Sequence, residues 1–293
     1  MDFLGGDFLG NLSGFFSGVS AFANEFLANY LTLEMFAKHL PFVLLGIITG
    51  ITSGLFGIGG GMIVVPVAVA FSMDAREAVA MSVMQMIFAS VFGSWLNYKK
   101  GKLDPREGAL VGLGGLLGAS LSAVVVKNVS DIALTAVFLG VSVIMFFKFF
   151  FGVKNPQGAN EQNALKKRLV LVGAGALTGV FAISLGIGGG LLLAPILGYF
   201  LGYDTKQISR MSLFFIVFAS ISGSISFFNA GISNPQIILN GVNIFVGAII
   251  GVTIGIKIME TLKLSSHRLA LLCVYSFSII ATGVGLIRKI LGV

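Results

Sequence analysis

The stretch GLFGIGGGMIVVPVAVAF, residues 54–71, sets the three successive glycines Gly59, Gly60 and Gly61 inside an apolar run that contains Pro66. In a soluble protein, a glycine-rich loop before a helix is typical of a phosphate site. Residues 184–200, SLGIGGGLLLAPILGYF, carry the same pattern. Glycine and proline both interrupt helices, so the pattern indicates a structural feature that the chain uses twice.

The composition of the chain is that of a membrane protein. Of its 293 residues, 56% are hydrophobic and 11% are charged, and the mean hydropathy is +0.98, whereas soluble domains have about 25% charged residues. Apolar runs of about 18 residues or more predict transmembrane helices. The alternating ten-residue segments of a β-barrel are absent from the sequence. We therefore expect an all-α polytopic membrane protein with the lipid bilayer as its solvent.

The same inventory argues against several functions. The net charge of +7 is interpreted as topology information and not as nucleic-acid binding, because no basic and aromatic cluster stands out. A single cysteine, Cys273, allows no disulfide within the chain and no Cys/His metal site. The sequence has none of the signatures of an intramembrane enzyme, such as paired aspartates at depth or His-Glu-x-x-His. We expect no catalytic residues, no metal and no cofactor.

An internal repeat divides the chain. Gly57–Pro66 matches Gly186–Pro195 at an offset of 129 residues, and DAREAVAMS (74–82) matches DTKQISRMS (204–212) at an offset of 130. We predict an amphipathic interfacial helix within 1–38, a first transmembrane repeat (39–151), a cytoplasmic linker (152–167) and a second repeat (168–293). For residues 8–33 the alternative is a further span across the membrane.

Each repeat contains five apolar segments, of which the first two are short. We expect them at about 41–56, 62–73, 78–98, 107–126 and 132–151, and again at about 169–185, 191–203, 208–228, 236–257 and 268–288. Sixteen helical residues reach about 24 Å and twelve about 18 Å, whereas the hydrocarbon core is about 30 Å thick. The glycine turns are therefore predicted to lie within the membrane, in a broken or re-entrant helix pair.

The positive-inside rule orients the two repeats. If the short pair returns to one side, or if each member crosses singly, 14 of the 19 basic residues fall on one face. If the pair fuses into one span, the split becomes 12 to 7. The first arrangement makes the repeats inverted and residues 99–106 and 152–168 cytoplasmic. Inverted repeats with interrupted helices are typical of secondary transporters, whose sites lie near the midplane between the repeats.

The two glycine turns form the predicted anion site. A helix N-terminus presents unpaired N–H groups and the positive end of the helix dipole, and glycine leaves both accessible. Hydroxyls and an amide of the third helix complete the site. The alternatives are close helix packing for the glycines and interhelical hydrogen bonding for the serines. The predicted substrate-binding residues are Gly57, Gly59, Gly60, Gly61, Gly186, Gly188, Gly189, Gly190, Ser82, Gln85 and Ser212, and the predicted hinges are Pro66 and Pro195.

Three other features refine this prediction. Gln85 stands opposite Phe215 in the repeat, so the two half-sites are not equivalent. Glycines elsewhere in the helices, such as Gly46, Gly50 and Gly251, are interpreted as sites of close helix contact. No charged residue falls at the centre of an apolar segment, so a proton relay through buried carboxylates is not predicted.

The doubled motif, GIGGGMIVVP and GIGGGLLLAP, each followed by a D-x-(R/K) turn and a serine-bearing helix, resembles the sulfite exporter TauE/SafE family over about residues 40–290. The resemblance implies transport of a small sulfur-containing anion, such as sulfite, thiosulfate or a sulfonate, across the bacterial inner membrane. We expect an exporter that works by alternating access. The alternative is an importer or channel for a small anion, because the sequence does not distinguish the directions.

Overall fold

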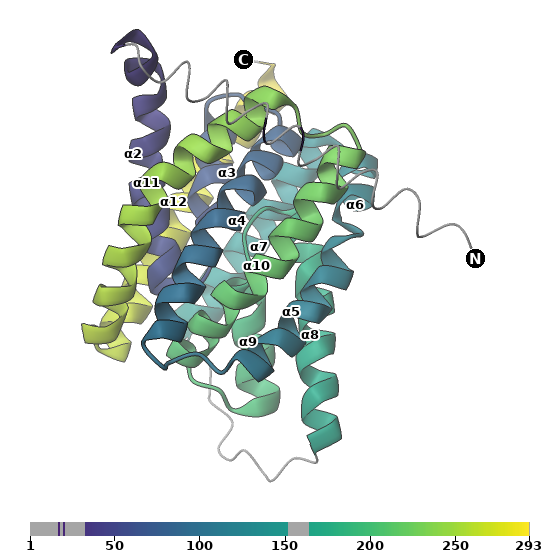
Figure 1. Ribbon diagram of the computed structural model, residues 1–293. Coiled ribbons are helices and arrows are strands. Elements are labelled where there is room, and N and C mark those ends of the chain that lie inside the picture. The colour runs from purple at the N-terminus through teal and green to yellow at the C-terminus, as the bar shows by residue number, and fades with distance from the viewer. Residues whose placement is uncertain (1–16, 18–19, 21–32, 152–163, 293) are drawn as a thin grey trace.

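The structure is a computed structural model, and it describes residues 17, 20, 33–151 and 164–292. The interfacial helix predicted within residues 8–33, and most of the predicted linker, lie outside these residues. Within them the regular elements are all α-helices (Figure 1). In chain order they are α2 (Leu33–Phe56), α3 (Gly61–Ala70), α4 (Ala75–Lys99), α5 (Pro105–Ala119), α6 (Ser122–Asn128), α7 (Asp131–Phe151), α8 (Ala164–Ser184), α9 (Gly190–Leu201), α10 (Thr205–Asn229), α11 (Pro235–Thr261) and α12 (Leu264–Leu291).

Helix length and hydropathy confirm a multi-pass membrane protein. The described residues include 8 helices that are long and apolar enough to cross a membrane, with α5 and α6 counted together. The two short apolar helices are α3, of 10 residues, and α9, of 12. Each half therefore has one of its two expected short segments, α3 or α9, directly after the glycine turn. The segment before the turn was also expected to be short, but it is α2, of 24 residues, or α8, of 21 residues, and both are long enough to cross a membrane.

One expected segment, 107–126, is not a single helix. It is divided into α5 and α6 at Ser120 and Leu121. The hydroxyl of Ser120 donates to the Leu117 carbonyl, and that of Ser122 donates to the Ala119 carbonyl. Serine hydroxyls that bond to helix carbonyls compete with the backbone and bend helices, which accounts for the break. The corresponding part of the second half, α11, is continuous.

The two halves exchange helices. The first helix of the first half, α2, packs along α11 of the second half, and α8 packs along α5 of the first half. Glycines line both contacts: a Cβ on Gly54 would lie 2.6 Å from the Val252 carbonyl oxygen, and a Cβ on Gly179 would lie 2.6 Å from that of Gly115. Small residues allow two helix backbones to approach this closely in a membrane. The interpretation of these glycines as packing residues is confirmed.

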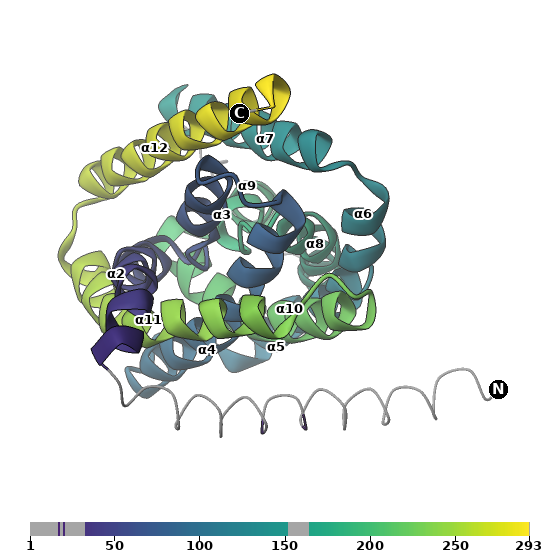
Figure 2. The ribbon, with the colours of Figure 1, turned by 90° about the horizontal axis from the view of Figure 1, so that it is seen from above.

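The short helices α3 and α9 lie inside the ring formed by the longer ones, as the view from above shows (Figure 2). Their sequences explain this position, because a helix that is apolar on all sides is buried. Met62 and Val64 of α3 and Leu193 and Leu197 of α9 have no exposed surface. In Figure 1, α3 lies in the upper part of the molecule and α9 in the lower part.

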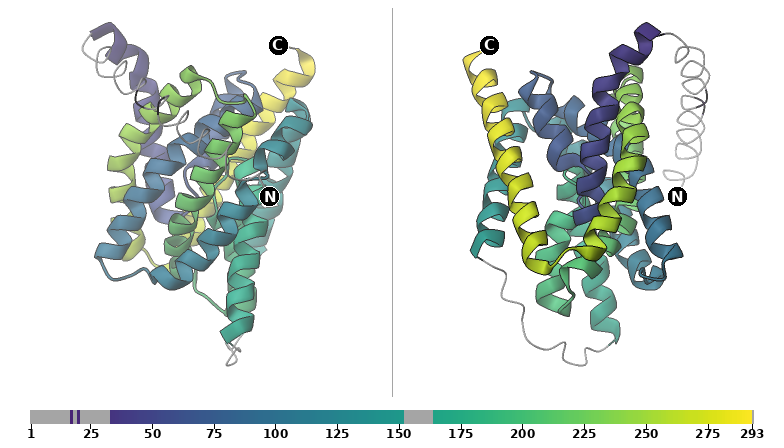
Figure 3. Two further views of the ribbon diagram at one scale, coloured as in Figure 1. Left: turned by 45° about the vertical axis from the view of Figure 1, so that its right-hand side comes forward. Right: turned by 90° about the vertical axis from the view of Figure 1, so that its left-hand side faces the viewer.

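The connections gather at two ends of the bundle (Figure 3). The α4–α5 connection, the end of α7 and the start of α8 lie at the lower end in Figure 1, together with the ion pairs Lys100–Glu260 and Lys102–Glu260, both 3.0 Å. The α3–α4 connection and the C-terminus lie at the upper end. These positions are compatible with inverted repeats, and the inversion itself stays a prediction.

Candidate functional site

The two glycine turns, residues 57–60 and 186–189, have similar backbones up to their last residue. Gly57 and Gly186 both have φ +65°, and Gly59 and Gly188 have φ +70° and +74°. Only glycine adopts this left-handed region without a steric cost, which explains why both copies of the repeat have glycine at these two positions. The turns stop α2 and α8 and start α3 and α9 in the interior of the bundle.

The turns contact one another directly. The amide of Gly190 donates to the carbonyl of Gly57 across 3.1 Å. A Cβ on Gly190 would lie 2.7 Å from the same carbonyl oxygen, and a Cβ on Gly61 would overlap the Gly186 carbonyl. The glycines are therefore needed here for contact between two backbones, in addition to any role toward a ligand.

The two predicted serines tie the halves together. The hydroxyl of Ser82 donates to the Gly186 carbonyl across 2.8 Å, and that of Ser212 donates to the Gly57 carbonyl across 2.7 Å. Both bonds join a third helix of one half to the glycine turn of the other half. Since the two serines and the two glycines are repeat mates, the bonds are equivalent. In this conformation both hydroxyl protons are engaged by the protein.

The side chain of Gln85 lies at the first turn. Its side chain is completely buried, and neither its amide nitrogen nor its amide oxygen has a partner among the described residues. Its Oε1 would lie 3.2 Å from a Cβ placed on Gly60. An unpaired buried amide is costly, so this side chain requires an explanation other than packing.

The second turn differs from the first at the equivalent place. Phe215, the repeat mate of Gln85, lies against Gly189, and Gly189 has a right-handed φ of −81°, whereas Gly60 has φ +78°. The amide end of the site therefore belongs to the first turn alone. This outcome agrees with the expectation that the two half-sites are not equivalent.

Two further residues, Thr49 and Ser53, were missed by the sequence analysis. Thr49 contacts Gly60, and Ser53 accepts the Gly57 amide on its carbonyl while its own buried hydroxyl has no partner among the described residues. They stand eight and four residues before Gly57, a spacing that places them on nearly one face of α2. This spacing was the signal that could have identified them.

The predicted hinges lie inside the short helices. Pro66 is in α3 and Pro195 is in α9. Proline has no amide proton, so each removes one bond of its helix, namely the one to the residue four positions earlier. That residue is Met62 in α3 and Leu191 in α9, within the first turn of each. Their role as hinges stays a prediction.

All eleven predicted substrate-binding residues come together at the centre of the molecule, and all are buried. The turns are packed against each other, so an anion can enter between them only if they separate. The conformation described is therefore closed at the predicted site.

Comparisons with known proteins agree with the resemblance noted in the sequence. The family model described as sulfite exporter TauE/SafE matches residues 42–282. The chain belongs to the sulfite exporter TauE/SafE family. A probable membrane transporter protein of Methanocaldococcus jannaschii is 25% identical over 242 residues, which cover 78% of this chain and 89% of that protein. Probable membrane transporter protein YdhB of Bacillus subtilis is 25% identical over 223 residues, covering 73% and 88%. No solved structure matches the chain.

As a member of the TauE/SafE family, the protein is a multi-pass membrane transporter. A relative from Haemophilus influenzae, also named a probable membrane transporter protein, is 25% identical over 228 residues, which cover 75% of this chain and 85% of its own length. Among the described residues, no group of three or more His, Cys, Asp or Glu side chains could hold a metal ion. Family membership indicates transport.

Proposed function

We propose that this TauE/SafE protein exports small sulfur-containing anions, such as sulfite or organosulfonates, from the bacterial cytoplasm by alternating access. The anion is held between the two glycine turns near the N-terminus of α3. The observation that carries the proposal is Gln85, a fully buried amide that finds no hydrogen-bond partner in the described part of the chain, beside Gly60 at the start of that helix. The proposal includes inverted repeats and cytoplasmic placement of residues 99–106 and 152–168.

The chemistry of the proposed site suits an oxyanion. The amide group of Gln85 can donate from Nε2, the N-terminus of α3 supplies the positive end of a helix dipole, and the hydroxyl of Ser53 is free to donate. The eleven predicted residues carry no formal charge. Neutral donors bind an anion loosely enough to release it, which a transporter requires.

The serine bonds support a simple exchange between two states. Without an anion, the hydroxyls of Ser82 and Ser212 hold the turns of the opposite halves. An anion between the turns competes for these hydroxyls and releases the Gly186 and Gly57 carbonyls. The two halves are then free to move relative to each other around the bound anion, as in other transporters built from repeats.

Export of an anion needs no coupled ion. A negative cytoplasm favours outward movement of one negative charge by about 2.3 kcal/mol per 100 mV. No charged side chain lies among the proposed binding residues. We therefore propose uniport driven by the membrane potential.

The test is transport by the purified protein in liposomes, with labelled sulfite, thiosulfate and isethionate, at a potential fixed by valinomycin and potassium. We expect saturable flux of at least one of these anions that rises with the outward driving force and does not need a proton or sodium gradient. Flux of none of them would reject the anion proposal. Flux that does not saturate would identify a channel, and flux that stops when the proton or sodium gradient is removed would reject uniport.

A further inference from the structure

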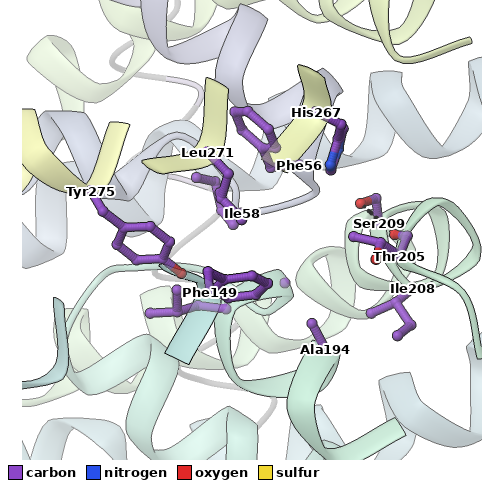
Figure 4. A pocket seen from close by; sticks show the side chains of 12 residues that line it. Phe56, Ile58, Phe149, Ala194, Thr205, Ile208, Ser209, His267, Leu271 and Tyr275 are labelled. Carbon is purple, nitrogen blue, oxygen red and sulfur yellow. Dashed lines mark hydrogen bonds between the residues drawn. The ribbon is translucent and has the colours of Figure 1, made fainter. Parts of the chain in front are cut away.

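Two cavities flank the glycine turns, and the internal repeat relates them. The first lies between α9, α10, α12 and the end of α7 (Figure 4). The second lies between α3, α4, α7 and α12. Four pairs of repeat mates line them in equivalent positions: Phe56 and Leu185, Ala194 and Val65, Thr205 and Ala75, and Ser209 and Val79. The cavities are thus equivalent parts of the two halves.

They differ in polarity. At these equivalent positions the first cavity has two hydroxyls, Thr205 and Ser209, where the second has Ala75 and Val79; elsewhere the second cavity is lined by Thr135 and Thr282. The first also contains the imidazole of His267 and the phenol of Tyr275. The first lies at the end of the bundle that carries the α4–α5 connection and most basic residues. A change from apolar to polar side chains at equivalent positions indicates that one cavity has a task that the other does not have.

Tyr275 is the most informative of these residues. Its side chain has no exposed surface, and its hydroxyl has no hydrogen-bond partner among the described residues. In Figure 4 the hydroxyl points into the cavity. Buried phenol groups normally find a partner. The partner of Tyr275 is therefore expected to be something that enters the cavity.

The electrostatic surroundings favour a negative ligand. The helices α9, α10 and α12 all begin at this cavity, through Gly190, Thr205 and the turn that carries His267. Each brings the positive end of its dipole. Two helices end here, α2 at Phe56 and α7 close to Phe149. Side-chain donors meet both ends: Arg268 donates from Nε to the Phe149 carbonyl across 2.7 Å, and His267 bonds to the Leu55 carbonyl of α2.

The acidic and imidazole side chains near the cavity do not oppose a negative ligand. The described residues that line the cavity include no Asp or Glu. Asp204, at the start of α10, is exposed and accepts from the Gln207 amide. His267 shares a hydrogen bond of 3.0 Å with the Leu55 carbonyl; because a carbonyl only accepts, Nε2 carries the proton and donates.

We propose that this cavity is a second anion subsite, through which the anion passes between the basic face of the protein and the glycine turns, and that the Tyr275 hydroxyl donates to it there. The subsite rests on the proposed function for the identity of its ligand. A small oxyanion enters this cavity when the cavity opens. In the closed conformation there is room for about one water molecule.

The test compares two variants of α12 that each remove one buried, unpaired hydroxyl. Tyr275→Phe removes the hydroxyl inside the cavity. Ser278→Ala is the matched control, because Ser278 is also completely buried and its hydroxyl has no partner within the described residues, but it does not line the cavity. Binding of labelled sulfite and thiosulfate is measured on protein in detergent, and transport is measured in liposomes with anion presented to the basic face. Thermal unfolding confirms that each variant is folded.

We expect Tyr275→Phe to weaken binding by about tenfold or more, the loss typical of one hydrogen bond to a charged group, with Ser278→Ala within twofold of the unmodified protein. Equal binding by Tyr275→Phe and the unmodified protein would overturn the subsite and leave the proposed function intact. Equal losses in Tyr275→Phe and Ser278→Ala would also overturn it.

Binding and transport separate the two proposals. If the unmodified protein binds an anion in a manner that depends on Tyr275 but carries none across the liposome membrane, the subsite stands and the proposed function fails. If the unmodified protein binds none of these anions, the subsite is rejected together with its ligand.

Discussion

The hydroxyl of Ser212 donates to the carbonyl of Gly57 across 2.7 Å, and through this bond α10 of the second half holds the glycine turn of the first half. Ser82 makes the equivalent bond to Gly186. The two bonds are equivalent in the internal repeat. In each of them, a serine from one half binds the glycine turn of the other half.

Removal of either hydroxyl is expected to loosen the turns. Ser82→Ala and Ser212→Ala should each lower the free energy of unfolding by about 0.5–1.5 kcal/mol, the net value of one hydrogen bond, and by similar amounts because the bonds are equivalent. Ser90→Ala and Ser220→Ala are the controls, since those hydroxyls donate within their own helices, to Ile87 and Ile216. Unfolding in detergent, followed by circular dichroism, measures the difference. Equal effects of all four substitutions would contradict a specific role for the cross-repeat bonds.

A methyl group between the two turns should prevent their contact. Gly61→Ala places a Cβ onto the Gly186 carbonyl, and overpacking of this kind costs about 1–3 kcal/mol. Gly140→Ala is the matched control, because Gly140 lies in the middle of α7 with open space around its Cβ position, and alanine favours a helix by up to about 1 kcal/mol over glycine. The apparent melting temperature should fall for Gly61→Ala and stay or rise for Gly140→Ala. A Gly61→Ala protein as stable as the unmodified one would show that the turns are not packed as described.

Gln85 should show opposite effects on stability and transport. Gln85→Leu removes an unpaired buried amide and is expected to raise the free energy of unfolding by about 1–3 kcal/mol, while it lowers the affinity for the transported anion about tenfold or more. Ser94→Ala is the control, because Ser94 is another buried α4 side chain whose hydroxyl has no partner among the described residues. It should keep full transport. If Gln85→Leu is stabilised and transports normally, Gln85 has no part in the site.

At the end of the bundle that carries the α4–α5 connection, Tyr203 should titrate late. Burial, together with the hydrogen bond of 2.7 Å to Glu107, raises the pKa of Tyr203 to about 12. A raised pKa means that the folded state holds the proton more tightly, so this stabilisation is complete below about pH 10 and is lost as the pH rises from about 10 to 12. The absorbance of tyrosinate at about 295 nm measures it, as the difference between the unmodified protein and Tyr203→Phe. Tyr199→Phe, which removes an exposed tyrosine, is the control and should keep the late component; loss of that component in Tyr199→Phe would contradict the assignment.

The sequence predicted the architecture because its signals are local. Long apolar runs, glycine followed by proline, and a doubled motif each determine structure within a few turns of helix, and they identified the short helices and the interior turns. The position of Gln85 opposite Phe215 could also be read from the repeat. The doubled glycine–proline motif also indicated the family.

What the sequence could not supply was the pairing of the halves. The bond from Ser212 to Gly57 joins residues 155 positions apart, and no local pattern specifies which carbonyl a buried hydroxyl selects. The break at Ser120 was missed for the opposite reason: two hydroxyls outweigh an apolar run that favours one continuous helix. The cavity at Tyr275 depends on four helices at once, so it becomes visible only in the assembled bundle.

The exchange of α2 and α8 between the halves also bears on how the chain is made. During synthesis α2 enters the membrane long before its partner α11 has been translated. The glycine face of α2 therefore stays without that partner until nearly the whole chain has been synthesised. The α5–α8 contact can form earlier. The α5–α8 contact near the middle of the sequence therefore forms before the α2–α11 contact, and loss of α11 late in synthesis would leave α2 without its main packing partner.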